Sequence, residues 1–171
     1  MMDEVASHVE QPLAKDSAMI TSSPRKIAER FIREGIAKAD PAVFDELVAE
    51  DIVVETGLSP MGPILGREAY KAVFLPFADA WPVQEFTVHR IDEAGDTVLI
   101  EFTALAVFEK DYYGVAATNQ LVPLREIHRL DVKDGQIVRN LVGAVNLPFE
   151  FLMYSALKDA VLGGLKTAGE A

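Results

Sequence analysis

The chain has 171 residues, with 16 Lys and Arg against 27 Asp and Glu, so its formal net charge is −11 with neutral histidines. This length fits one domain with a sizeable core, and the absence of cysteine excludes a thiol nucleophile, a disulfide and a thiolate metal site. The acidic balance argues against nucleic acid and anionic lipid as partners. Half of the residues are hydrophobic, which is untypical of a disordered acidic chain. We therefore expect a neutral or apolar partner, or a second copy of the chain.

The two ends of the chain differ in pattern from its middle. Residues 1–22 lack helical and strand periodicity and are predicted to form a flexible N-terminal arm, and residues 164–171 read as a C-terminal tail. No repeat, linker or composition break interrupts residues 23–163, which predicts a single domain there. Because no export signal and no apolar run of about 18 residues is visible, we expect a cytoplasmic protein without a membrane segment.

Two helix start signals open the predicted domain. Ser23-Pro24 supplies an N-cap and a proline at the first helical position, and apolar residues recur at helical spacing to about Ala37. Asp40-Pro41 repeats this signal and predicts a second, shorter helix, whose apolar stripe reaches Val48.

A strand, a loop and a third helix are expected next. The β-branched stretch 52–56 predicts a short strand, and the two prolines of 57–66 predict a loop. The third helix begins near Arg67 and is expected to be kinked or stopped by Pro76. Trp81 follows it and is interpreted as a core residue.

From Val83 the apolar period changes to two, and 93–96 is typical of a hairpin turn. Long strands are predicted over 97–109, 121–132 and 136–146, followed by a helix over 146–162. This order predicts an α+β fold in which helices cover one face of a curved sheet.

The strand from Thr97 has two faces because side chains alternate across a strand. Its even-numbered face is apolar throughout and must be the covered, concave face: Val98, Ile100, Phe102, Ala104, Ala106 and Phe108. Its odd-numbered face is also mostly apolar, which favours a homodimer through the outer face of the sheet. The alternative is that the tail or a long strand covers this face.

Two ionisable residues share the even-numbered face of the next strand. Glu126 and His128 are expected to point into the apolar concavity, where burying both is unfavourable unless they pair. Such a pair would supply an acid/base couple, which makes both residues candidate catalytic residues. The alternatives are a satisfied structural pair in the core, or a shifted register that turns both side chains outward.

Further residues are predicted to bind a ligand in the same concavity. Asn140 on the last strand is a candidate for orienting a carbonyl group, and Thr56 offers a hydroxyl near the rim. Asn146 is interpreted as the N-cap of the final helix. The expected apolar lining is Phe31, Val54, Phe102, Ala104, Ala106, Leu130 and Val142.

The pattern resembles the nuclear-transport-factor-2-like superfamily, in particular its SnoaL-like polyketide cyclase, limonene-epoxide hydrolase and ketosteroid isomerase branches. The resemblance covers about residues 24–162 and rests on the helix order and on three stretches: 49–56, 66–70 and 134–137. It implies a cone-shaped, mixed but mostly antiparallel sheet with three to four helices on its concave face. It also implies a deep apolar pocket, homodimers, and no metal or organic cofactor.

The catalytic positions of the ketosteroid isomerases carry other residues here. By the resemblance, the ketosteroid isomerases use a tyrosine on the first helix, a general-base aspartate and a protonated aspartate. The corresponding residues here are, in that order, Phe31, Thr56 and His128. Proton transfer by that set of residues is therefore not expected. His128 alone keeps a titratable group at a position that the family uses for chemistry.

The other two branches match no better. The epoxide hydrolase residues correspond to Val54, Thr56, Phe102, Ala104 and Val142, none of which activates water. The nearest candidates for the aspartate of the SnoaL-type cyclases are Asn140 and Asn146, which are not bases at neutral pH.

Two hypotheses about function stay open. The first is a cofactor-independent enzyme that acts by acid/base chemistry on a hydrophobic, carbonyl-bearing compound, in which His128 moves the proton, Glu126 orients it, and Asn140 or Thr56 holds the oxygen. The second is a non-catalytic ligand-binding or scaffold protein. A nucleotide-binding module is disfavoured because no glycine-rich phosphate loop is present, and the three scattered histidines predict no metal site.

Overall fold

The structure is a computed structural model that describes residues 23–145 and 153–159. Its helices are α1 (Pro24–Arg30), continued by the π-helical segment η1 (Phe31–Ile36), α2 (Pro41–Leu47) and α3 (Arg67–Ala80). Its strands are β1 (Val48–Glu55), β2 (Ile64–Leu65), β3 (Val83–Ala94), β4 (Thr97–Val107), β5 (Leu121–Lys133) and β6 (Gln136–Ala144).

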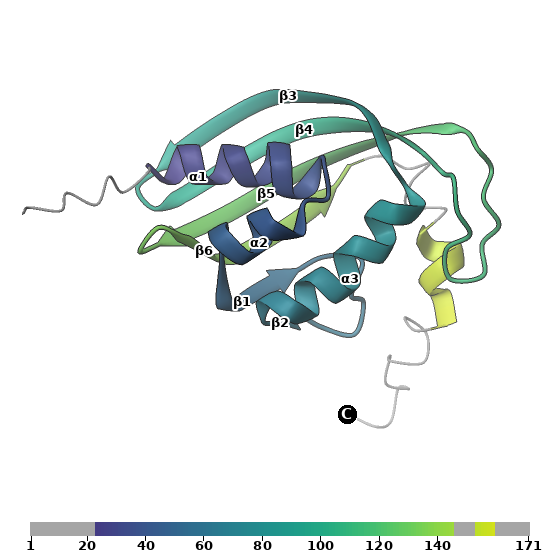
Figure 1. Cartoon of the computed structure of the whole chain (residues 1–171), viewed down its shortest axis with the longest axis horizontal. Coiled ribbons are helices and arrows are strands. Elements are labelled where there is room, and N and C mark those ends of the chain that lie inside the picture. Colours follow the sequence, from purple (N-terminus) through teal and green to yellow (C-terminus); the bar gives the residue numbers. More distant parts are fainter. Residues whose placement is uncertain (1–22, 146–152, 160–171) are drawn as a thin grey trace, which may run out of the picture.

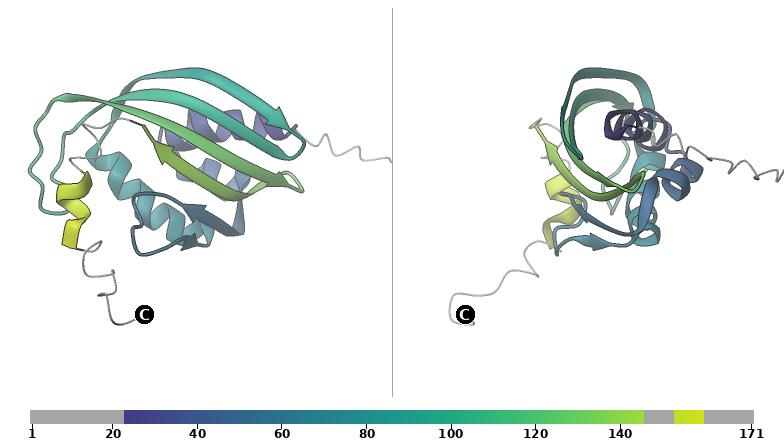
Figure 2. Two further views of the ribbon diagram at one scale, coloured as in Figure 1. Left: turned by 180° about the vertical axis from the view of Figure 1, so that it is seen from behind. Right: turned by 90° about the vertical axis from the view of Figure 1, so that its left-hand side faces the viewer.

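One six-stranded sheet, in the order β2-β1-β6-β5-β4-β3, organises the described residues. β1 and β6 pair in parallel, and every other neighbouring pair is antiparallel. The helices lie on one side of this sheet (Figure 1), and the long strands curl around α1 when the molecule is viewed along it (Figure 2). The predicted α+β architecture, with helices on the concave face of a mixed, mostly antiparallel sheet, is confirmed.

Side-chain caps start the first two helices as predicted. The Ser23 hydroxyl accepts a hydrogen bond from the Lys26 amide at 3.4 Å, and an Asp40 carboxylate oxygen accepts one from the Ala42 amide at 2.9 Å. Each cap is followed by a proline at the first helical position, whose missing N–H needs no partner there.

The first helix changes its winding after Arg30. The Ala37 amide donates to the Ile32 carbonyl five residues earlier, at 3.0 Å, which is the π-helical pattern. Gly35 lies against the Phe31 ring, and a β-carbon at this position would lie 3.0 Å from a ring atom. The wider turn therefore suits a residue without a side chain.

The first strand is longer than predicted. It begins at Val48 rather than at residue 52, because Val48 pairs with Ile137 of β6 and is thereby taken out of the preceding helix. A register shift between Val48 and Val53 leaves both Glu50 and Asp51 exposed. The predicted loop 57–66 also contains β2, which pairs with β1.

Pro76 does not stop α3, although a stop was one of the two predicted outcomes, the other being a kink. The helix continues to Ala80 with Pro76 in its interior. Pro76 is exposed, whereas Phe74 and Phe77 on the same helix are buried against the sheet. Tertiary packing of these aromatic side chains therefore outweighs the hydrogen bond that proline removes.

The inner faces of β4 and β5 form the floor of the core. The predicted even-numbered residues of β4 are all buried, as are their counterparts Val122, Leu124, His128, Leu130 and Val132 on β5. Trp81 is buried and stacks on Phe108 with ring centroids 4.1 Å apart, as expected of a core residue.

The beginning of β6 departs from simple alternation. Ile137, on the face predicted to point outward, is fully buried, and Val138 is only partly buried. A register shift in the β5 pairing between Asp131 and Val132 exchanges the two faces at this point. From Asn140 onward the predicted inward face is correct.

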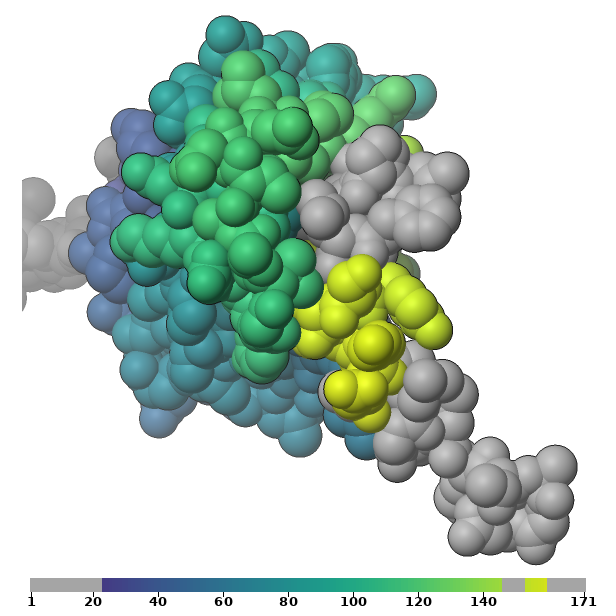
Figure 3. Space-filling view, turned by 90° about the vertical axis from the view of Figure 1, so that its right-hand side faces the viewer, coloured from purple at the N-terminus to yellow at the C-terminus, as the bar shows by residue number. Residues whose placement is uncertain are grey.

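A short helix over 153–159 is part of the predicted C-terminal helix and lies beside the loop between β4 and β5 (Figures 1 and 3). Its Met153 and Leu157 side chains are buried in the core. The expected N-cap Asn146, the rest of that helix, the N-terminal arm and the C-terminal tail lie outside the described residues.

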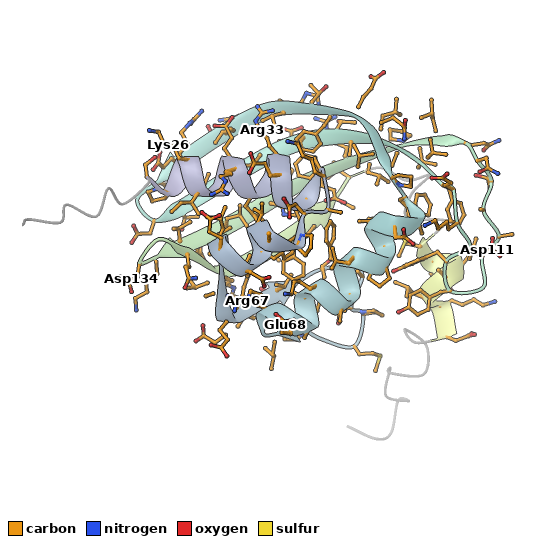
Figure 4. All side chains as sticks on the ribbon, viewed as in Figure 1. Lys26, Arg33, Arg67, Glu68, Asp111 and Asp134 are labelled. Atoms are coloured by element: carbon orange, nitrogen blue, oxygen red, sulfur yellow. The ribbon has the colours of Figure 1, made fainter. Side chains whose placement is uncertain are left out.

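Charged side chains lie around the outside of the fold (Figure 4). Lys26 on α1, Glu68 on α3, Asp111 in the β4–β5 loop and Asp134 in the β5–β6 turn are all exposed. The acidic excess therefore does not occupy the core of the described part of the chain.

We expect Phe44→Ala to lower the free energy of unfolding by about 3–5 kcal/mol, because a fully buried ring leaves a cavity when it is removed. Phe44 lies 5.2 Å from Phe31, 5.2 Å from Tyr70 and 5.5 Å from Phe74, measured between ring centroids. Urea denaturation followed by circular dichroism measures the change. Met61→Ala is the control, since Met61 is exposed and should shift stability by less than about 0.5 kcal/mol. An equal effect of both substitutions would contradict this account of the core.

Candidate active site

A cavity of about 290 Å³ lies between the helices and the inner face of the sheet. Its walls come from η1, α3, β5, β6, the turn after β1 and the helix 153–159, and most of them are apolar. The lining residues are Ile36, Thr56, Gly57, Leu58, Tyr70, Phe74, Phe77, Glu126, His128, Val142, Ala144 and Met153.

His128 and Glu126 form a hydrogen-bonded pair on one wall of the cavity. Both side chains extend from the inner face of β5, and His128 Nε2 lies 3.0 Å from Glu126 Oε2. His128 is only 2% exposed, and its ring lies 5.3 Å from that of Phe102. Its Nδ1 atom is buried without a hydrogen-bond partner among the described residues.

This pairing has a chemical consequence for the histidine. An ionised carboxylate only accepts hydrogen bonds, so the Nε2 proton of His128 points to Glu126. The neutral ring then carries its lone pair on Nδ1, which is the basic nitrogen. Within the described residues, the pair therefore holds one unpartnered ring nitrogen, buried in a largely apolar environment.

A second polar pair connects α3 with β6. The Asn140 side-chain amide donates to the Tyr70 hydroxyl with Nδ2 and O 3.0 Å apart, and both residues are buried. Burial raises the pKa of Tyr70 above its ordinary value, the Asn140 hydrogen bond opposes this, and the charge of Glu126 raises it further. Tyr70 is therefore a neutral phenol at all ordinary pH values.

The predicted site residues divide into two groups. Glu126, His128, Thr56 and Val142 line the cavity together. Asn140 is not one of the lining residues, and its amide donates to the Tyr70 hydroxyl. The other predicted ligand-binding residues are buried in the surrounding core: Phe31, Val54, Phe102, Ala104, Ala106 and Leu130. Among them, Phe102 and Ala104 line a separate cavity of about 30 Å³.

Sequence reasoning missed the contribution of α3 to the site. Tyr70, Phe74 and Phe77 follow one another at spacings of four and three along this helix, so they share its inward face. That aromatic spacing was readable in the sequence, but it indicates only burial. Which buried residues border a cavity depends on how far the helix lies from the sheet.

Two further findings concern other kinds of site. Within 23–145 and 153–159, no group of three or more His, Asp or Glu residues is arranged to hold a metal ion. None of the described helices has the length and apolar composition that crossing a lipid bilayer requires.

The curved six-stranded sheet with helices on its concave face is the cone-shaped fold of nuclear-transport-factor-2-like proteins. The family model "SnoaL-like domain" matches residues 28–140, so the chain belongs to the SnoaL-like domain family. No curated protein is significantly similar to it in sequence.

Solved structures show the same fold at low sequence identity. A candidate SnoaL-like polyketide cyclase from Jannaschia sp. CCS1 superposes with a TM-score of 0.67 at 17% identity, over 82% of this chain and 97% of the other. IdmH from Streptomyces antibioticus, described as a candidate polyketide cyclase, gives 0.64 at 21% over 80% and 99%. An epoxide hydrolase from M. tuberculosis, similar to limonene-epoxide hydrolase, gives 0.58 at 18% over 82% and 96%.

We expect the stability advantage of the wild type over Tyr70→Phe to shrink above pH 10. Because the pKa of Tyr70 is raised in the folded protein, the unfolded chain loses the phenol proton at a lower pH than the folded chain does. The stabilisation of the wild type relative to Tyr70→Phe is therefore complete below pH 10 and is lost as the pH rises. The difference in the free energy of unfolding should narrow by about 1.4 kcal/mol in total between pH 9 and pH 11. Urea titrations between about pH 9 and pH 11 measure it, and a constant difference across this range would contradict the burial of Tyr70.

Proposed function

We propose that this protein catalyses proton transfer on a small, apolar, carbonyl-bearing molecule bound in the cavity. His128 moves the proton and Glu126 orients the imidazole. The main support is one observation: a buried histidine and a partly buried glutamate, 3.0 Å apart, line a cavity whose other walls are mostly apolar. A positioned histidine of this kind accelerates proton transfer roughly 10²- to 10⁴-fold.

In the proposed step, the imidazole of His128 takes a proton from the carbon next to the carbonyl group. The C–H electron pair moves toward the carbonyl oxygen and forms an enolate, while the imidazolium keeps its Nε2 proton directed at Glu126. The imidazolium then returns the proton to the same carbon or to a conjugated one. This sequence restores the enzyme and needs no oxidant or other co-reactant.

The size and lining of the cavity limit the substrate. Its volume of about 290 Å³ is at the small end for ligand pockets. A cavity of about 150 Å³ holds one benzene ring, so two fused rings are an appropriate size here. Phe74 and Phe77 offer flat apolar walls to such a molecule.

A second candidate function is ligand binding without turnover. By the resemblance, the related enzymes carry ionisable groups at the positions of Phe31, Val54 and Val142. These three residues cannot transfer protons, which favours ligand binding alone. In that case the His128–Glu126 pair is a satisfied structural pair, and the cavity holds an apolar ligand unchanged.

Hydrogen exchange separates these two candidates without knowledge of the natural substrate. We expect the wild type to accelerate the exchange of the α-hydrogens of 2-tetralone in D₂O, measured by proton NMR. His128→Ala should reduce the protein-dependent rate roughly 10²- to 10⁴-fold, and Glu126→Gln should reduce it less, because the ring remains.

His89→Ala is the matched control for this experiment. His89 is exposed, and its Nε2 lies 2.8 Å from the Thr103 hydroxyl, so its removal should leave the rate unchanged. Exchange by His128→Ala at the wild-type rate would overturn the proposed mechanism. Binding of 2-tetralone without any accelerated exchange would favour the ligand-binding candidate.

We also propose that the outer face of the sheet binds a second copy of the chain. Leu99 on β4 and Leu141 on β6 both pair with Arg129 on β5 and so form one row across this face. They are 37% and 39% exposed, and Leu121 on β5 is 57% exposed. Apolar side chains in this position are better covered by a partner than by water.

The double substitution Leu99→Asp and Leu141→Asp should convert a dimer to a monomer, because a symmetric interface brings the new charges of both copies together. Sedimentation equilibrium measures the mass of each protein. Met61→Asp adds a charge at an exposed site outside this face and should leave the dimer intact. A monomeric wild type would show that the outer face has no partner of this kind.

A further inference from the structure

Tyr70 offers the cavity a hydroxyl group in a fixed position. It lines the cavity and is 3% exposed, and its ring packs between Phe31, Phe44 and Phe74 with centroid distances of 6.4, 5.2 and 6.2 Å. Contacts on several sides hold the ring in one orientation. The hydroxyl oxygen is therefore held in one place.

The hydrogen bond from Asn140 determines what this hydroxyl can do. Asn140 Nδ2 carries only protons, so the Tyr70 oxygen is the acceptor in the 3.0 Å contact. The Tyr70 proton remains available, and within the described residues the hydroxyl donates to no acceptor. An accepted hydrogen bond also strengthens the donor ability of the same hydroxyl.

We propose that Tyr70 is the hydrogen-bond donor that holds the substrate's oxygen, and that Asn140 is the residue that positions it. This inference rests on the proposed function, because it assigns the oxygen of the same carbonyl compound on which His128 acts. Tyr70 and His128 line the same cavity, so one bound molecule can meet both groups. Tyr70 would then stabilise the negative charge that develops on that oxygen during proton transfer.

Thr56 is the other hydroxyl on the cavity wall, and it is the weaker candidate. Its oxygen accepts a hydrogen bond from the Leu58 amide at 3.3 Å, within the turn that follows β1. It is only partly buried, so water competes with a ligand for its proton. Water has little access to the proton of Tyr70, because this residue is buried among aromatic rings.

The ligand class that follows is a planar, apolar molecule with one oxygen that carries negative charge, such as an enolate. Ionised 2-naphthol has this shape and charge, and naphthalene is the same shape without the oxygen. We expect the wild type to bind 2-naphtholate more tightly than naphthalene, as measured by fluorescence titration at a pH at which the probe ionises. A hydrogen bond to a charged oxygen should be worth roughly a 10- to 100-fold difference in affinity.

Tyr70→Phe should remove this preference and leave the affinity for naphthalene unchanged. Asn140→Asp is the sharper variant, because its carboxylate would accept the Tyr70 proton and reverse the hydrogen bond while keeping the shape. It should therefore abolish the preference as well. Asn140→Leu, which buries no charge, provides a second variant if Asn140→Asp does not fold, and it should reduce the preference. Thr56→Val is the matched control and should retain it.

The opposite results overturn the inference. A preference that survives in Tyr70→Phe, or that is lost in Thr56→Val instead, shows that Tyr70 is not the donor. An equal loss of affinity for both probes shows a merely structural role, and a wild type that binds neither probe, or both equally, excludes this oxygen site. A preference that survives in every folded Asn140 variant removes the positioning role.

Failure of the proposed function is recognised separately from failure of this inference. His128→Ala should abolish hydrogen exchange on 2-tetralone but keep the preference for 2-naphtholate over naphthalene. Absent exchange together with a Tyr70-dependent preference would reject the enzyme and keep the oxygen site. Normal exchange without that preference would reject the oxygen site alone.

Discussion

A polar side chain inside an apolar cone must find a partner within the protein, and this requirement organises the site. The inner face of β5 places Glu126 and His128 side by side, where their 3.0 Å contact satisfies both. The same requirement joins Tyr70 on α3 to Asn140 on β6, the strand next to β5. Within the described part of the chain, groups without a partner remain in both pairs: a ring nitrogen of His128 in the first, and the Tyr70 hydroxyl proton and the Asn140 side-chain oxygen in the second.

The scaffold around these pairs is built from aromatic packing and sheet curvature. Phe31, Phe44 and Phe74 surround Tyr70 and hold α3 at a distance from the sheet. The sheet curls because its long antiparallel strands twist together around α1 (Figure 2). The cavity is the space that the helices and the curved sheet leave unfilled between them. The packing that forms the core therefore also shapes the pocket.

Membership of the SnoaL-like domain family leaves the chemistry of this particular chain to its own residues. Among the described residues, His128, Glu126 and Tyr70 are the ionisable ones that line the cavity. We propose that a histidine base and a phenol donor together supply what a pair of carboxylates supplies elsewhere. Apart from Glu126, the acidic residues of the described regions lie mainly on exposed helices, strands and turns, away from this site (Figure 4).

The sequence by itself determined the capped helices, the alternation of β4 and β5, and the inward direction of Glu126 and His128. These features depend on local spacing, which a strand or helix expresses directly. Only the tertiary structure decided that β1 begins at Val48, that α3 continues through Pro76, and that Tyr70 borders the cavity. Each of these depends on contacts between segments distant in the sequence, such as the Val48 pairing with β6 and the hydrogen bond from β6 to α3. Local spacing carries no information about those contacts.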